Sequence, residues 1–256
     1  MREPLNIVKA GGQVVEDELA LGRLLDSFRE LPGHKILVHG GGRTATRLAS
    51  GLGIRSRMLN GRRITDADTL KVVTMVYAGL VNKNIVAKLQ ARGIDAAGLC
   101  GADFNIILSQ KRPSEPVDYG FVGDISEVNA GALSRVLESG AVPVICPITH
   151  DGKGGLLNTN ADTVATAVAG ALCQAFDVSL TFCFEKKGVL LDAGNPDSVI
   201  SSLNREDYAG LLESGAVSEG MIPKLDNAFK ALEAGVGCVR ITDAEGLGRP
   251  GGTLIV

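Results

Sequence analysis

Aromatic residues are scarce in this chain of 256 residues: Trp is absent, and aromatic residues together account for 4% of the sequence. Hydrophobic residues still make up 45%, so Val, Ile, Leu and Ala must fill the core that a chain of this length can bury. An aliphatic core of this kind is typical of β-strands covered by alanine-rich helices.

The chain also lacks an excess of positive charge and any long apolar segment. Its net charge of −3 argues against nucleic acid as the main partner. The most apolar helical stretch, residues 164–176, contains Thr and Gln and is too short to span a bilayer. No basic segment precedes an apolar one near the N-terminus. We therefore expect a cytoplasmic protein that binds neither nucleic acid nor membranes.

Several motifs with known chemistry are missing. None of the five cysteines forms a C-x-x-C pair, and most lie in or beside apolar runs, which predicts buried free thiols. The lack of a G-x-x-x-x-G-K-[ST] loop excludes a P-loop kinase, and the lack of H-R-D and D-F-G excludes a protein kinase. With three histidines, the chain offers no convincing Ser-His-Asp arrangement.

The sequence does contain an alternation of strands and helices. Strands are predicted at residues 5–8 and 35–38, and each is followed by a glycine-rich turn and a helix, over residues 16–31 and 42–51. This order predicts an α/β fold whose strands pair in parallel. In such sheets ligands bind beyond the carboxyl ends of the strands, where both glycine turns lie.

Further along the chain, Asn60-Gly61 predicts a hairpin, and residues from Asp66 to about Arg92 predict one long helix. No linker or repeat divides the sequence. We therefore expect one continuous sheet with two lobes that meet near residue 176.

The turn Gly40-Gly41-Gly42 fits G-x-G-x-x-A, but a dinucleotide site also needs an acid roughly 20 residues later. No Asp or Glu lies between Leu31 and Thr65, so that interpretation fails. Exposed N–H groups at a helix start still favour an anion. The alternative is a glycine turn that only packs, and the entropy lost by three consecutive glycines makes the anion site the preferred interpretation.

Three charged residues border such turns, and each has an ordinary explanation when taken alone. Lys9 ends a strand and would simply be solvated. Asp162 follows the helix-capping Asn160 and would complement the helix dipole. Lys224 follows Pro223 in the first turn of a helix, where the dipole opposes a cation, so structural and functional interpretations balance.

Taken together, five motifs in register resemble the amino acid kinase family over essentially the whole chain. Their order and spacing are most similar to the members that phosphorylate N-acetylglutamate. The motifs are Lys9-Ala-Gly-Gly12, His39-Gly-Gly-Gly42, Asn60-Gly-Arg-Arg-Ile-Thr65, Asn158-Thr-Asn-Ala-Asp162 and Gly220-Met-Ile-Pro-Lys224.

This resemblance implies an αβα sandwich around a mainly parallel open sheet. Residues 1–176 would form an N-terminal lobe for acylglutamate binding and dimerisation, and residues 177–256 a C-terminal lobe for nucleotide binding. It also implies that Lys9 and Lys224 stabilise the transferring phosphoryl group and that Asp162 holds both ammonium groups. The implied acylglutamate-binding residues are Gly41, Gly42, Arg63 and Asn158.

The implied nucleotide-binding residues are Gly12, Glu185, Gly188, Ala216, Val217, Ser218 and Met221. One segment departs from the family pattern, because Phe184-Glu-Lys-Lys-Gly188 stands where Thr or Ser, Asp, Val, any residue and Gly are usual. The nucleotide would be ATP with Mg²⁺ carried largely by its phosphates, since the sequence shows no carboxylate cluster for a metal.

The implied reaction is ATP-dependent phosphorylation of the side-chain carboxylate of N-acetyl-L-glutamate, in arginine biosynthesis. A carboxylate with a pKa near 4.3 is already a nucleophile at neutral pH, so lysines suffice and no general base is needed. Two alternatives stay open: a kinase for N-succinylglutamate or another N-acyl amino acid, and a non-catalytic regulatory relative that binds nucleotide or amino acid.

The resemblance also leads us to expect a homodimer that free arginine does not inhibit. The arginine-sensitive hexamers of the family carry an extra N-terminal helix, and here only Met1 to Pro4 precede the first strand. The long helix would supply the interface through Val72, Val73, Val76 and Leu80. The alternative for these four residues is packing in the protein's own core.

Overall fold

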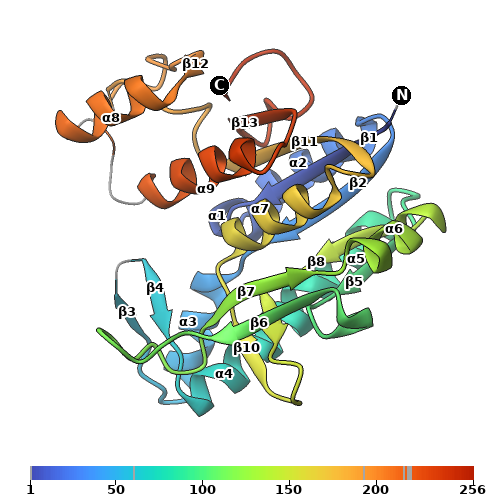
Figure 1. Ribbon diagram of the computed structural model, residues 1–256, viewed down its shortest axis with the longest axis vertical. Coiled ribbons are helices and arrows are strands. Elements are labelled where there is room, and N and C mark those ends of the chain that lie inside the picture. The colour runs from blue at the N-terminus through green and yellow to red at the C-terminus, as the bar shows by residue number, and fades with distance from the viewer. Residues whose placement is uncertain (1, 60, 193, 216, 218–220) are drawn as a thin grey trace.

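The computed structural model describes residues 2–59, 61–192, 194–215, 217 and 221–256. Its centre is an eight-stranded sheet in the order β12-β14-β13-β11-β1-β2-β8-β5, in which all neighbours are parallel except β13 and β14 (Figure 1). The predicted parallel sheet is confirmed, and the antiparallel edge was not foreseen. The strands are β1 (Glu3–Ala10), β2 (His34–His39), β5 (Ala96–Leu99), β8 (Val142–Ile145), β11 (Phe176–Phe184), β12 (Ser202–Leu203), β13 (Cys238–Asp243) and β14 (Thr253–Ile255).

Helices cover both faces of this sheet, because successive strand side chains point to opposite faces. On β1, Leu5 and Ile7 belong to one apolar core, whereas Val8 and Ala10 belong to the other. The predicted αβα sandwich is therefore confirmed. The first core includes residues of α6 (Ala130–Glu138), α7 (Ala161–Leu172), α8 (Arg205–Glu213) and α9 (Ile222–Glu233). The second includes residues of α1 (Gly12–Glu16), α2 (Glu18–Glu30), α3 (Gly42–Gly51), α4 (Ala67–Thr74) and α5 (Asn82–Gln90).

The helix expected over residues 16–31 is broken near its start. Asp17 separates α1 from α2, and its carboxylate accepts hydrogen bonds from the N–H groups of Leu19 (2.9 Å) and Ala20 (2.8 Å). Asp17 is therefore the N-cap of a second helix, since a side-chain acceptor there satisfies amides that lack helical partners.

The long helix predicted from Asp66 is a continuous helical run that contains a π-helical segment, Met75–Val81, between α4 and α5. Asp66 caps the run by accepting a hydrogen bond from the Thr69 N–H at 2.8 Å. The interface prediction is corrected for three of its four residues. Val72, Val73 and Val76 are fully buried in the protein's own core, so the packing alternative was right for them, and Leu80 alone of the four is 52% exposed.

A smaller sheet and a hairpin complete the fold, and both lie in the lower half of Figure 1. The sheet has the order β10-β9-β6-β7, formed by Leu156–Asn158, Ile148–His150, Ile107–Lys111 and Gly123–Val128, and it was not predicted as a separate sheet. The predicted hairpin is present as β3 (Arg57–Leu59) and β4 (Arg62–Ile64), which pair antiparallel. The hairpin's turn residue Asn60 lies outside the described residues. Elsewhere in the chain, a short 3₁₀ turn spans Asp103–Asn105.

β1 pairs with β2 on one side and with β11 on the other, so the two predicted lobes share one sheet. All five cysteines are free thiols, as predicted, and Cys146, Cys173 and Cys183 are buried. Within the described ranges, no helix combines the length and the apolar character that crossing a membrane requires.

Candidate active site

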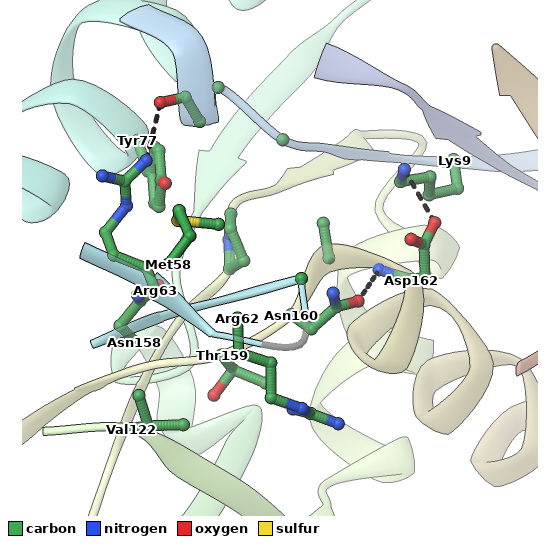
Figure 2. A pocket seen from close by; sticks show the side chains of 16 residues that line it. Lys9, Met58, Arg62, Arg63, Tyr77, Val122, Asn158, Thr159, Asn160 and Asp162 are labelled. Carbon is green, nitrogen blue, oxygen red and sulfur yellow. Dashed lines mark hydrogen bonds and ion pairs between the residues drawn. The ribbon is translucent and has the colours of Figure 1, made fainter. Parts of the chain in front are cut away.

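A buried ion pair joins the first strand to the start of α7. Lys9 lies on the same face of β1 as Ile7, so its side chain points towards α7. Its Nζ lies 2.7 Å from Oδ1 of Asp162, and the two side chains are only 8% and 12% exposed (Figure 2). The capping prediction also holds, since Asn160 Oδ1 accepts a hydrogen bond from the Asp162 N–H at 2.8 Å. Asp162 thus serves the helix start and at the same time neutralises a buried cation.

Two glycine turns meet beside this ion pair. A Cβ on Gly40 would lie 3.8 Å from the backbone nitrogen of Gly12, so the turns after β1 and β2 are in close contact. Gly41 has φ of +153°, and a Cβ there would lie 3.1 Å from Cδ1 of Tyr77. Glycine is strongly favoured at this position, because the backbone conformation strains other residues and a Cβ would crowd the Tyr77 ring.

Arg63 closes the opposite end of the site. Its guanidinium donates to Ser56 Oγ (2.8 Å) through Nη1, and to Gly42 O (2.8 Å) and Thr46 Oγ1 (2.9 Å) through Nη2. The side chain is buried, yet its Nε has no hydrogen-bond partner. A buried donor without a partner is costly. Arg63 also lines the pocket, where the positive charge of its guanidinium favours a carboxylate ligand.

Asn158 is held next to Arg63 by a short chain of hydrogen bonds. Asn158 Nδ2 donates to Thr65 Oγ1 at 3.0 Å, and Thr65 Oγ1 donates to the Arg63 carbonyl oxygen at 3.0 Å. These contacts use one amide hydrogen of Asn158, and the rest of its amide is available to a ligand.

These residues surround one pocket with a volume of about 190 Å³. It brings together six of the predicted residues, namely Lys9, Gly41, Gly42, Arg63, Asn158 and Asp162. Figure 2 shows the Lys9–Asp162 pair at one end of the pocket and Arg63 with Tyr77 at the other. Met58, Arg62, Tyr77 and Val122 also line it and were missed, because nothing in their local sequence distinguishes them from core or surface residues.

Lys224 lies near this pocket but does not line it. Its Nζ is 5.9 Å from the centroid of the Phe184 ring. Phe184 also packs against the first glycine turn, since a Cβ on Gly11 would lie 3.4 Å from the Cβ of Phe184. The aromatic ring therefore places Lys224 next to that turn, and a contact between Lys224 and Asp162 stays a prediction.

The predicted nucleotide-binding residues are not gathered in this pocket. Glu185 lines a separate pocket of about 590 Å³ with Gln13 and Arg43, on the side of α1. Val217 and Met221 are buried in the first apolar core. The other four predicted residues differ in their surroundings: Gly12 has open space around it, Gly188 packs against Thr253, and Ala216 and Ser218 lie outside the described residues.

A buried histidine supports the second glycine turn from behind, and its place in a motif was the one local signal for it. His39 Nδ1 is 2.8 Å from Gly40 O, and Asn82 Nδ2 is 3.1 Å from His39 Nε2. Burial lowers the pKa of His39 to about 4, so the ring is neutral. Nδ1–H therefore donates to Gly40 O, and Nε2 accepts from Asn82.

Because of the π-helical segment, two residues of one helical run lie against the second glycine turn and its supporting histidine. Tyr77 packs against Gly41, and Asn82, five residues later, binds His39. Residues five apart in an α-helix face directions about 140° apart, at 3.6 residues per turn. The wider π turn brings them to similar directions, and such turns are frequent at functional sites.

No group of three or more His, Cys, Asp or Glu side chains that could hold a metal ion is present in the part of the chain that the structure describes. The pocket itself is lined by Lys9, by the glycine turn with its backbone N–H groups and by the arginines Arg62 and Arg63. Such a set stabilises negative charge and binds carboxylates.

This arrangement of an αβα fold with two glycine turns and a buried lysine–aspartate pair agrees with a comparison of sequences. A profile of the amino acid kinase family matches residues 4–243, and the chain belongs to that family. An acetylglutamate kinase from Phocaeicola vulgatus is 58% identical over 255 residues, covering 100% of this chain and 99% of that protein. Another acetylglutamate kinase, from Methanopyrus kandleri, is 41% identical and covers 98% of this chain and 100% of its own length. The crystal structure of smu.665 from Streptococcus mutans superposes with a TM-score of 0.81 at 29% identity, covering 98% of both chains.

Proposed function

We propose that the chain transfers the γ-phosphoryl group of ATP to the side-chain carboxylate of an N-acyl-L-glutamate. The product is an N-acyl-γ-glutamyl phosphate, a step of arginine biosynthesis. N-acetyl-L-glutamate is the substrate named in relatives that match the chain from end to end. The buried Lys9–Asp162 pair, next to two glycine turns, is the observation that carries the proposal.

Positioning and charge stabilisation account for the catalysis. The substrate carboxylate is ionised at neutral pH and attacks phosphorus without a base. Two anions must then approach each other, and negative charge spreads over the phosphoryl oxygens. Lys9, which Asp162 holds in place, and Lys224 stabilise that charge, and the N–H groups of Gly41 and Gly42 hold the carboxylate.

The remaining contacts orient the acceptor. Arg63 binds the α-carboxylate of the acylglutamate through the charge of its guanidinium, and Asn158 completes the contact. The reacting carboxylate is fixed at one end of the pocket and the α-carboxylate at the other. The bound substrate is thereby held in a near-attack conformation. No other group needs to move during the transfer.

The nucleotide, its metal ion and the assembly belong to the proposal as well. ATP binds with Mg²⁺ on its phosphates, and the residues proposed to contact it are Gly12, Glu185, Gly188, Ala216, Val217, Ser218 and Met221. Residues 1–176 bind the acylglutamate and form the dimer, and residues 177–256 bind the nucleotide. We propose a homodimer in the cytoplasm, where ATP is available.

An ADP-release assay over a panel of N-acyl amino acids tests the proposed function. Acylglutamates should release ADP, and hydroxylamine should trap the product as a γ-hydroxamate. Glutamate without an acyl group and N-acetylaspartate are the matched controls, and both should be poor substrates. ADP release without any hydroxamate, or no release with every acylglutamate, would overturn the proposal in favour of another acceptor or a regulatory role.

A further inference from the structure

Arg62 lies where the candidate active site meets a neighbouring cavity. It precedes Arg63 on β4, and since strand side chains alternate, the two arginines point in opposite directions, as Figure 2 shows. Gly61, Arg62 and Asn160 line the active-site pocket, and the same three residues line a second cavity of about 470 Å³. We call this cavity the side cleft. Its shared wall makes it the natural extension of the substrate pocket.

Among the residues that line the side cleft, positive side chains outnumber the negative ones that could pair with them. Arg112 donates to both carboxylate oxygens of Asp124, with distances from 2.5 to 3.2 Å, and Tyr208 Oη donates to Asp226 at 3.0 Å. Both acids that line the cleft therefore have partners. The side chains of Arg62 and Lys230, by contrast, make no hydrogen bond or ion pair with any residue in the described ranges.

The surroundings of Arg62 disfavour its charge on balance. Burial lowers the pKa of Arg62 and the positive charge of Arg112 lowers it further, whereas Asp124 and Tyr119 raise it by less. Arginine stays protonated even so, and partly buried arginines are normally paired with an acid. A bound carboxylate would supply the missing partner in a two-pronged contact that a guanidinium makes well.

The proposed contacts of the two substrate carboxylates leave the side of the pocket that contains Arg62 for the acyl group. The reacting carboxylate lies at the Lys9 end, and the α-carboxylate lies at Arg63. The Gly40–Gly42 turn and Tyr77 close one side of the pocket, where a Cβ on Gly41 would already contact the Tyr77 ring at 3.1 Å. The wall that contains Arg62 also lines the side cleft, so an acyl group longer than acetyl has space in that direction.

We infer that the side cleft receives the acyl group, and that Arg62 selects acyl groups that end in a carboxylate, such as that of N-succinyl-L-glutamate. This inference rests on the proposed function and narrows its substrate class. An acetyl group ends in a methyl and leaves Arg62 without a partner. A succinyl group is longer by a methylene and a carboxylate, and it reaches into the cleft.

Steady-state kinetics with three substrates tests this assignment. The substrates are N-acetyl-L-glutamate, N-succinyl-L-glutamate, and the analogue of the latter whose terminal carboxylate is an uncharged amide. The wild type should have a KM for the succinyl substrate at least about tenfold below that for the amide analogue, since a charge-assisted contact is lost in the latter.

The variant Arg62→Leu should raise the KM for N-succinyl-L-glutamate by roughly ten- to a hundredfold and leave kcat nearly unchanged, because the contact acts on ground state and transition state alike. Its KM for N-acetyl-L-glutamate should change by less than about threefold. Arg57→Leu, on the other strand of the same hairpin and outside both cavities, should leave all three substrates unaffected.

Equal KM values for the succinyl substrate and its amide analogue in the wild type would overturn the inference. So would an Arg62→Leu variant that loses the acetyl and succinyl substrates to the same extent. Turnover of N-acetyl-L-glutamate without any preference for the terminal carboxylate would refute this inference alone, whereas no acyl phosphate from any acylglutamate would refute the proposed function.

Discussion

The variant Asp162→Asn should be among the most destabilising conservative substitutions in the chain. The Lys9 side chain is 8% exposed, and its Nζ lies 2.7 Å from the Asp162 carboxylate. Asparagine keeps the shape of the side chain and removes its charge, so the Lys9 ammonium would remain buried without a counter-ion. Breaking a buried pair in this way costs about 3–5 kcal/mol.

A matched control separates this effect from the loss of a helix-start acid. Asp207 lies in the first turn of α8, and its N–H donates to the capping Asn204 at 2.8 Å, as that of Asp162 does to Asn160. Asp207 is exposed and forms no ion pair among the described residues. Asp207→Asn should therefore lose only the interaction with the helix dipole, about 0.3–1 kcal/mol.

Urea denaturation of both variants measures the difference directly. If Asp162→Asn does not fold, the double variant Lys9→Met/Asp162→Asn should fold, because it buries no charge. Equal losses of unfolding free energy in Asp162→Asn and Asp207→Asn would refute the reasoning, and so would a double variant that is no more stable than Asp162→Asn.

Four further predictions address the other parts of the site. Lys224→Met should lower kcat at least about a hundredfold while circular dichroism shows an intact fold, and near-normal turnover would remove Lys224 from the mechanism. Arg63→Lys should raise the KM for acylglutamate about tenfold or more with little change in the KM for ATP, and the reverse pattern would mean that Arg63 belongs to the nucleotide side. Gly41→Ala should lower stability by about 1–3 kcal/mol, since φ is +153° there, whereas Gly210→Ala, with open space in α8, should not, and equal thermal shifts would contradict this. Burial lowers the pKa of His39 from 6.5 to about 4. The neutral ring therefore contributes to the free energy of unfolding in full above pH 6.5, and this contribution is lost as the pH falls towards 4. The loss is about 3 kcal/mol, at 1.36 kcal/mol per pKa unit. A His39→Gln variant should lack that loss in urea titrations at pH 7 and pH 4.5, and an unchanged pH dependence would contradict the assignment.

The sequence predicted the parts of the site that depend on local signals. Strand ends, glycine turns and helix caps depend on a few neighbouring residues each. Asn160 and Asp162 could therefore be assigned to a helix start from their spacing alone. The side of the sheet that Lys9 faces follows from strand alternation once Ile7 is known to be in the core. The ion pair between them depends on how β1 and α7 pack, which the spacing does not show.

Other features depend on the tertiary structure and had no local signal. Arg62 and Arg63 are neighbours on β4 and look alike in the sequence, yet the side chain of Arg63 has three hydrogen-bond partners and that of Arg62 has none in the described ranges. The π-helical segment keeps the apolar pattern of an ordinary helix. The small sheet joins β6 to β9 through a single parallel bridge between residues 42 positions apart, Leu108 and His150. Each of these differences arises from contacts between distant segments.

Transfer of oxygen from the substrate to phosphate tests the central claim most directly. N-acetyl-L-glutamate with ¹⁸O in both side-chain carboxylate oxygens is incubated with ATP and the enzyme, and hydroxylamine then cleaves the product at its carbonyl carbon. If the carboxylate attacks phosphorus, each phosphate released carries one ¹⁸O, and mass spectrometry shows a gain of two mass units. The Lys9→Met variant should release almost no labelled phosphate. Phosphate without the label, released by the wild-type protein at the rate of ADP formation, would contradict the account.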